Sequence, residues 1–157
     1  MTTHDMAKTT NLTIGIIGGG QLGRMLAMAA ARLNHRTIVL EPQADCPAAQ
    51  ACNDQIVAAY DDENALAQLA SRCDVVTYEF ENVPVAAAEK LSASVPVYPP
   101  AQALSASQDR LTEKRFLNDC GIPTADFRAV DSQEELEAAL AAFGGKGVLK
   151  TRRMGYD

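Results

Sequence analysis

The chain contains no tryptophan, and aromatic residues make up only 5% of its 157 residues. Large rings therefore contribute little to the interior, and we expect Ala-rich helices and Val- and Ile-rich strands to form the core. Hydrophobic residues at 47% and charged residues at 22% are typical of a soluble globular protein. This length accommodates one ordinary domain, or one small domain and part of another.

Histidines and closely spaced cysteine pairs are also scarce. The four cysteines contain no Cys-x-x-Cys pair, and the sequence has just two histidines, His4 and His35. These counts argue against a structural zinc site. We expect the cysteines to be free thiols in a reducing compartment.

The chain also lacks a net positive charge and long apolar runs. A net charge of -6 argues against a general binder of nucleic acid or of anionic membranes. No apolar run approaches the roughly 20 residues that cross a bilayer, and the polar residues 1–11 lack the apolar region of a secretory signal. We therefore expect a soluble cytoplasmic protein with neither a nucleic-acid nor a membrane partner.

Strand and helix patterns alternate in the first two thirds of the chain. Apolar runs predict buried strands over residues 12–17, 37–40, 74–80 and 95–98. Helical patterns lie between them, over residues 21–33, 61–71 and 84–91. In the first helix, one apolar face, expected to be the core-facing side, is formed by Leu22, Met25, Leu26, Ala29 and Leu33. This alternation predicts an α/β fold with a parallel sheet.

The pattern changes after Pro99-Pro100. We predict a helix over residues 105–120 with a break near Ser107, strands over 126–130 and 147–152, and a helix to Phe143 opened by a Ser132/Glu135 capping box. The resulting division is a flexible tail (1–11), a first domain (12–102) and the start of a second (103–157). The second part is poorly sized to fold alone, so we expect the chain to be a fragment.

A glycine-rich loop follows the first predicted strand. Gly18-x-Gly20-x-x-Gly23 lies between that strand and a helix, which is the position of a dinucleotide-binding fingerprint. Glycines there let backbone amides approach an anion at the helix N-terminus. Glu41, at the end of the second strand, has the spacing of a ribose-binding carboxylate. The loop alone is typical of an NAD site or of a packing turn, whereas Gln21 suits a compact polar ligand.

Two further segments carry charged residues at strand ends. Glu79 and Glu81 follow the third strand, at the edge where open α/β sheets bind ligands, and their carboxylates suit an amine or ribose hydroxyls. Lys150, Arg152 and Arg153 form a basic group that is either a phosphate subsite or a solvated strand end. A lysine inside a buried apolar strand needs an anionic partner, which favours the phosphate hypothesis for Lys150.

Together these motifs resemble those of the 5-(carboxyamino)imidazole ribonucleotide synthases, a family of ATP-grasp enzymes of purine biosynthesis. The resemblance rests on four segments in the same order: GGGQLGRM (18–25), TYEFENVP (77–84), DRLTEK (109–114) and LKTRRMGYD (149–157). It implies a Rossmann-like pre-ATP-grasp domain with a parallel sheet, followed by the truncated start of an ATP-grasp domain. It also implies a homodimer.

The resemblance further implies a reaction and its participants. Members of this family use ATP, magnesium and bicarbonate to carboxylate 5-aminoimidazole ribonucleotide, and bicarbonate is activated as carboxyphosphate. The motifs match ATP contacts at Arg110, Lys150, Gly155, Tyr156 and Asp157. They match ribonucleotide contacts at Gln21, Leu22, Glu79 and Tyr156. No catalytic residue or magnesium ligand is assigned within the chain, and we expect the chain alone to be inactive.

Three alternatives stay open at this point. A formate-dependent glycinamide ribonucleotide transformylase is another ATP-grasp ligase with a similar first domain. An NAD(P)-dependent oxidoreductase is what the glycine loop would suggest by itself. A non-catalytic binding fragment is the third.

Overall fold

The computed structural model of the protein describes residues 11–155. The chain divides into two compact units, residues 1–105 and residues 106–157. Within the described range, no helix has both the length and the apolar character needed to cross a lipid bilayer.

A parallel four-stranded sheet forms the centre of the first unit, in the order β3-β2-β1-β4. Its strands are β1 (Thr13–Ile17), β2 (Arg36–Leu40), β3 (Asp54–Ile56) and β4 (Val75–Tyr78). β1 is central, and Ile17 at its end pairs with Leu40 of β2 and with Tyr78 of β4. The carboxyl ends of these three strands therefore meet at one edge of the sheet. The α/β prediction is confirmed.

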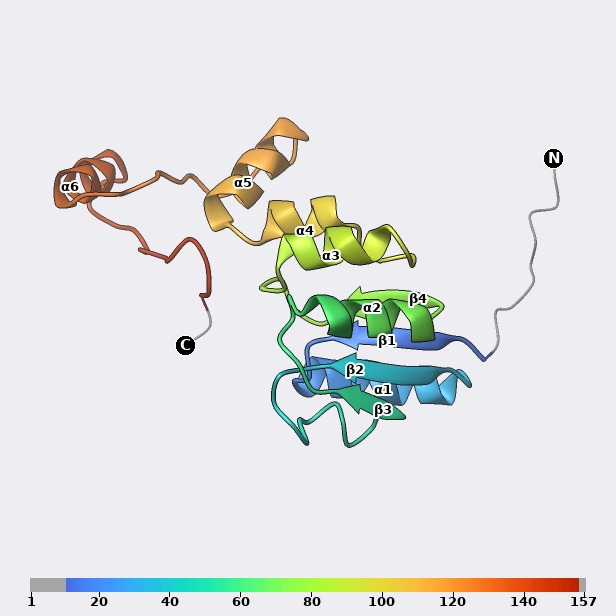
Figure 1. Ribbon diagram of the computed structural model, residues 1–157. Helices are drawn as coiled ribbons and strands as arrows, with labels where there is room; N and C mark the ends of the chain where they lie inside the picture. Colours follow the sequence, from blue (N-terminus) through green and yellow to red (C-terminus); the bar gives the residue numbers. More distant parts are fainter. Residues whose placement is uncertain (1–10, 156–157) are drawn as a thin grey trace, which may run out of the picture. The chain divides into compact units, whose positions relative to one another are not determined.

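Helices cover both faces of the sheet. α1 (Gln21–Arg32) lies on one face, and α2 (Glu63–Arg72) and α3 (Val85–Ser92) lie on the other (Figure 1). Leu66, Leu69 and Leu91 on the second face belong to the main core, to which α4 (Ala101–Ser107) adds Leu104. Crossovers on both faces are expected for a sheet that extends in both directions from its first strand.

The predicted core-facing side of α1 is wrong. The side chains that this helix buries are small, those of Gly23, Ala27 and Ala30. Met25 is 56% exposed and Leu33 is 67% exposed. The small residues are spaced by four and then three positions, so they lie on one side of the helix and allow its backbone to approach the sheet closely.

Two strand predictions in the first unit also need correction. β3 has only three residues, and the sequence pattern did not predict it. The segment from Val95 to Tyr98 forms a single parallel bridge between Val97 and Val76, not a strand. The ladder cannot extend because Pro96 and Pro99 have no N–H to donate, and the N–H of Val95 donates to Leu91 at the end of α3.

The second unit contains α5 (Arg110–Asp119) and α6 (Gln133–Ala142). The predicted break near Ser107 is confirmed, because α4 ends there and α5 begins at Arg110. The predicted strands over 126–130 and 147–152 are wrong. Both segments are largely exposed, and no β-ladder joins either of them to another strand within residues 11–155. An extended segment becomes a strand only when its backbone finds a partner.

The helix predicted after Ser132 is confirmed. Ser132 Oγ accepts a hydrogen bond from the N–H of Glu135 at 3.2 Å. The Glu135 carboxylate returns to accept from the N–H of Asp131 at 2.7 Å. This is a capping box displaced by one residue on its return side.

Candidate functional site

Three strand ends converge at one edge of the first unit. The glycine loop follows β1, Glu41 follows β2, and Glu79 follows β4. In open α/β sheets this edge, on either side of the first strand, is where ligands bind. The structure thus brings together the loop and the carboxylate that the sequence predicted for the ribonucleotide.

The loop has glycine where a side chain would not fit. Gly18 has φ +102°, a conformation that residues with a Cβ rarely adopt, and a Cβ there would lie 2.5 Å from Glu79 Cγ. A Cβ on Gly23 would lie 2.7 Å from the carbonyl oxygen of Gly18 and 2.9 Å from Glu79 Oε2. The carboxylate therefore fills the space that these two glycines leave open.

Glu79 connects β4 to the first turn of α1. Its Oε1 accepts a hydrogen bond from the N–H of Gly20 at 2.7 Å, and its Oε2 accepts one from the N–H of Gly23. The first-turn amides of a helix have no intrahelical acceptor, so a carboxylate here satisfies them and complements the helix dipole. Each carboxylate oxygen retains capacity for another donor. Glu79 can therefore hold the loop and accept from an amine together.

Glu41 likewise accepts a hydrogen bond from the glycine loop, at Gly19, the residue before Gly20. Its Oε2 accepts from the N–H of Gly19 at 2.8 Å and also from the hydroxyl of Tyr60. Its Oε1 accepts from the N–H of Gln43 at 3.1 Å. Glu41 is thus turned back onto the loop, not outward to a ribose, and this geometry weighs against the NAD hypothesis.

Gln21 and Leu22 lie at the first two positions of α1, directly after the loop. Both are exposed, and Leu22 is 57% exposed. Arg24, one turn further on, donates to Gln50 Oε1 at 2.8 Å. The structure therefore exposes Gln21 and Leu22 on the first turn of α1, whose Gly20 and Gly23 amides bind the Glu79 carboxylate. Arg24 is instead held in a contact with another part of the chain.

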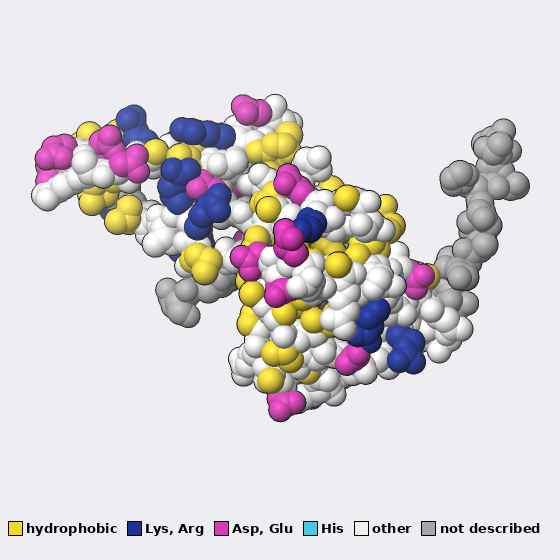
Figure 2. Space-filling model, viewed as in Figure 1, with side chains coloured by type: hydrophobic (Ala, Val, Ile, Leu, Met, Phe, Trp, Pro, Cys, Tyr) yellow, Lys and Arg dark blue, Asp and Glu magenta, His cyan; other side chains and the backbone are white. Residues whose placement is uncertain are grey.

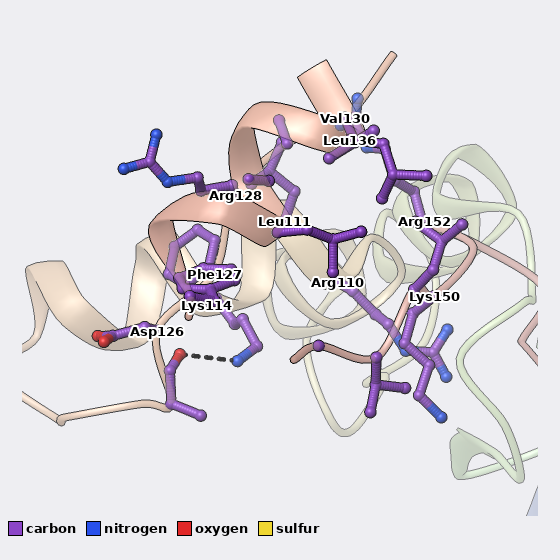
Figure 3. A pocket seen from close by; sticks show the side chains of 18 of the residues that line it. Arg110, Leu111, Lys114, Asp126, Phe127, Arg128, Val130, Leu136, Lys150 and Arg152 are labelled. Atoms are coloured by element: carbon purple, nitrogen blue, oxygen red, sulfur yellow. Dashed lines mark hydrogen bonds between the residues drawn. The ribbon is translucent and has the colours of Figure 1, made fainter. Parts of the chain in front are cut away.

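The second unit contains a cavity of about 870 Å³. Its wall combines apolar side chains with cationic ones that come from α5 and from the extended segments on either side of α6. Figure 3 shows Arg110, Lys150 and Arg152 gathered on one side of it. Lys114 lies with Phe127, its Nζ 5.3 Å from the ring centroid. A cavity lined by both apolar and cationic side chains suits a base and phosphates.

Acidic and basic side chains are separated on the surface of this unit. On the visible face, Lys and Arg gather over one part and Asp and Glu over the end formed by α6 (Figure 2). The acidic residues of α6 include Glu134 and Glu135 in its first turn. The residues that line the cavity include Lys and Arg side chains, among them Arg110, Lys114 and Lys150.

Asp109 organises the cationic side of the cavity. Its carboxylate caps α5 by accepting from the N–H groups of Leu111 and Thr112, both at 3.0 Å. Its other oxygen lies 2.8 Å from Arg152 Nη2 and 3.8 Å from Arg153 Nε. The N–H of Thr112 and the Arg152 guanidinium lower the pKa of Asp109 to about 2.

The ion pairs of Asp109 separate the three residues of the predicted basic group into two kinds. Arg152 and Arg153 are both engaged with Asp109. Lys150 is exposed and lines the cavity. Because its segment is not a buried strand, the argument that a buried lysine needs an anion is wrong here. Lys150 remains a candidate for binding phosphate because it lies in the cavity wall.

Arg110, which lines the cavity, also contacts the last described segment of the chain, residues 151–155. The Arg110 N–H donates to the carbonyl of Arg152 at 2.9 Å, and Arg110 Nη1 donates to the carbonyl of Thr151 at 3.0 Å. A Cβ on Gly155 would overlap the Arg110 guanidinium, so the two residues lie in direct contact. The structure thus brings together Arg110, Lys150 and Gly155. Tyr156 and Asp157 lie outside the described residues.

Sequence reasoning missed several residues of these two sites. The roles of Tyr60 and of the Asp109 cap depend on side-chain directions that spacing does not reveal. Asp109 did carry a signal, since an Asp before a helical run is a typical N-cap.

For metals, no group of three or more His, Cys, Asp or Glu side chains within residues 11–155 is placed to hold an ion.

Comparison with known proteins supports the resemblance predicted from the motifs. The chain is 68% identical over 145 residues to an N5-carboxyaminoimidazole ribonucleotide synthase of Brucella melitensis, an alignment covering 92% of this chain and 40% of that protein. The chain thus spans about 40% of the length of the curated relatives it matches.

Solved structures agree. The ADP complex of an N5-carboxyaminoimidazole ribonucleotide synthetase superposes with a TM-score of 0.88 at 44% identity, over 94% of this chain and 39% of that one. An Aspergillus clavatus N5-carboxyaminoimidazole synthase in complex with ADP and 5-aminoimidazole ribonucleotide gives a TM-score of 0.76 at 35% identity, over 86% and 37%.

Residues 11–108 match the family described as the ribonucleotide synthetase preATP-grasp domain. That range contains the whole sheet, the glycine loop, Glu41 and Glu79. This chain belongs to the ribonucleotide synthetase preATP-grasp domain family.

Proposed function

We propose that this chain supplies the ribonucleotide-binding part of an enzyme that carboxylates 5-aminoimidazole ribonucleotide. The product is N5-carboxyaminoimidazole ribonucleotide, an intermediate of de novo purine biosynthesis, and the co-substrates are ATP and bicarbonate. The proposal is supported by relatives named as N5-carboxyaminoimidazole ribonucleotide synthases. The carboxylate of Glu79 at the edge beside the glycine loop is the observation that carries it.

Glu79 is suited to orient the amine of the ribonucleotide. Its oxygens are fixed by the amides of Gly20 and Gly23, so the carboxylate is already in place before a ligand arrives. An exocyclic N–H that donates to it is held with its lone pair free to attack an activated carbon. Gln21 and Leu22, exposed on the same turn, are proposed to line this site.

The cationic side of the second unit is suited to ATP. Arg110 and Lys150 line the cavity, and Gly155 leaves room against the Arg110 guanidinium. A planar guanidinium and an ammonium are the groups that proteins use for phosphate oxygens. ATP supplies a phosphoryl group that activates bicarbonate. The contribution of this chain is to hold and orient the phosphates.

Further parts of the proposal rest on the family resemblance. They are a requirement for Mg²⁺, homodimeric assembly, ATP contacts by Asp157, and contacts to both ligands by Tyr156. The binding of bicarbonate belongs with them. A cytoplasmic location is proposed from the sequence itself, since residues 1–11 lack the apolar region of a secretory signal. Each is testable once the protein is prepared at the length of its relatives.

ADP release measures the proposed reaction. In a form extended to the length of the relatives, we expect release to require 5-aminoimidazole ribonucleotide and bicarbonate together. Formate in place of bicarbonate should give no release above background. Formate-dependent release with glycinamide ribonucleotide would instead support the transformylase alternative.

A further inference from the structure

The backbone amides of the glycine loop are already bonded to the chain's own oxygens. The N–H of Gly18 donates to the carbonyl of Leu40 at 3.0 Å. The N–H groups of Gly19, Gly20 and Gly23 all donate to carboxylates, the first to Glu41 and the other two to Glu79. In a dinucleotide-binding loop, amides at these positions serve the pyrophosphate. Here the same positions hold two anions that belong to the protein.

Neither carboxylate is a loosely placed surface group. Glu41 receives hydrogen bonds from three directions, namely from Gly19, Gln43 and the Tyr60 hydroxyl. Tyr60 is half-buried and packs edge-on against Phe80, with ring centroids 5.8 Å apart. Burial and the bond to Glu41 raise the pKa of Tyr60, so its hydroxyl remains a proton donor at neutral pH.

The two carboxylates bind the amide donors of the loop, and they also fill the space beside those amides. A Cβ on Gly19 would overlap the Glu41 side chain, and a Cβ on Gly20 would lie 2.8 Å from Glu79 Oε1. A phosphate placed against these amides would meet negative charge at van der Waals distance. Repulsion between like charges at such distances in a half-buried site is substantial.

We infer that Glu41 and Glu79 are specificity-determining residues that act as built-in anions, so that the glycine loop rejects phosphate groups and pyridine dinucleotides. Glu41 is also a positioning residue, because with Tyr60 it fixes the turn from which Gln21 and Leu22 project. Ligand recognition at this edge then selects for hydrogen-bond donors over anions. The inference does not depend on which reaction the protein catalyses.

The experiment replaces the internal anion by an external one. Glu79→Ala is prepared in the 157-residue chain, with Glu89→Ala as the control, since Glu89 is an exposed carboxylate on α3. Sodium formate is the probe, and sodium chloride at equal ionic strength is its reference. The readouts are the thermal unfolding midpoint and the amide signals of the loop glycines in a ¹H–¹⁵N spectrum.

We expect Glu79→Ala to lower the midpoint by roughly 5 °C or more. Formate should recover part of this loss and shift the Gly20 and Gly23 signals. The unchanged chain and Glu89→Ala should respond alike to formate and chloride. Because these signals come from the loop glycines themselves, an anion bound elsewhere on the protein is not mistaken for one bound at the glycine loop.

A second variant keeps the test decisive if Glu79→Ala does not fold. Glu41→Gln retains an oxygen for one donor and removes the charge, and it should bring a formate-dependent shift of the Gly19 signal. NADH is then titrated against each folded variant and against the unchanged chain. A formate effect that is the same in variant and unchanged chain, or NADH binding by the unchanged chain through the loop glycines, would overturn the inference.

Discussion

The carboxylate of Asp109 lies 2.8 Å from Arg152 Nη2 while it also caps the first turn of α5. One side chain thereby holds the beginning of a helix and the end of an extended segment more than forty residues later. Arg110, next to this cap, is oriented by the same arrangement because its N–H donates to the carbonyl of Arg152.

This relationship predicts a dependence of stability on acid. The pKa of Asp109 is lowered from its ordinary 3.8 to about 2, so its stabilising contribution is complete above about pH 4 and is lost as the pH falls toward 2. Asp109→Asn should lower the unfolding free energy by roughly 1–2 kcal/mol at pH 7. Thermal unfolding of both forms between pH 2 and 7 should show this difference shrinking with acid. A difference that is constant with pH would contradict the prediction.

Lys150→Ala should raise the KM for ATP by roughly ten- to a hundred-fold, with less effect on the KM for the ribonucleotide. The reason is that Lys150 lines the cavity beside Arg110, the cavity that we propose for the phosphates of ATP. Both constants are measured by steady-state kinetics on a form of the protein extended to the length of its relatives. Arg115→Ala, an exposed cation on α5, is the matched control and should leave both unchanged.

Glu79→Gln should mainly impair use of the ribonucleotide. The amide keeps one acceptor oxygen, but its NH₂ group then faces an N–H of the loop, and the charge that attracts an amine is gone. We expect affinity for 5-aminoimidazole ribonucleotide to fall by roughly ten- to a hundred-fold in calorimetric titrations. Glu89→Gln, an exposed carboxylate on α3, is the comparison and should leave this affinity unchanged. If Glu79→Gln and Lys150→Ala showed the same substrate dependence, the division into two sites would be wrong.

Gly18→Ala should cost more stability than Gly121→Ala. Both glycines have positive φ, +102° and +77°, so both changes strain the backbone, by about 1 kcal/mol. At Gly18 the new Cβ also meets Glu79 Cγ at 2.5 Å, whereas at Gly121 it meets nothing within 4 Å. Denaturant unfolding of the two variants measures the difference. Equal losses would show that Glu79 moves aside freely.

Cys120 should react first with iodoacetamide. It is exposed, whereas Cys46 is 1% exposed. Burial raises the pKa of Cys73 to about 11 and also raises that of Cys52, which lowers the fraction of reactive thiolate at neutral pH. Peptide mass spectrometry at short reaction times identifies the labelled site. Labelling of Cys73 as fast as Cys120 would contradict the burial of its thiol.

The parallel sheet and the edge that carries Glu79 follow from sequence patterns, because apolar runs ending in polar residues mark strand ends directly. The prediction of which side of α1 packs on the sheet was wrong. Hydrophobicity points to large residues, whereas small residues make the close contact with the sheet. The two predicted strands of the second unit failed for another reason. Their local pattern is extended, but strand pairing is a non-local property, and none of the described segments pairs with them.

The role of Glu41 was beyond sequence reasoning for a further reason. Its spacing from the loop is the same whether its carboxylate turns outward to a ribose or inward to Gly19. The choice is made by Tyr60, nineteen residues later, whose position depends on how the chain packs after β3.

The packing of α1 has a practical consequence for protein engineering. Because the helix is attached through Gly23, Ala27 and Ala30, its outer residues Met25 and Met28 contribute little to folding and remain open to redesign. Exchanging them for Lys, Gln or Glu changes solubility and crystal packing while leaving the interior as it is. The same helix offers rigid attachment points for fluorescent or spin labels, within a few turns of the Glu79 carboxylate.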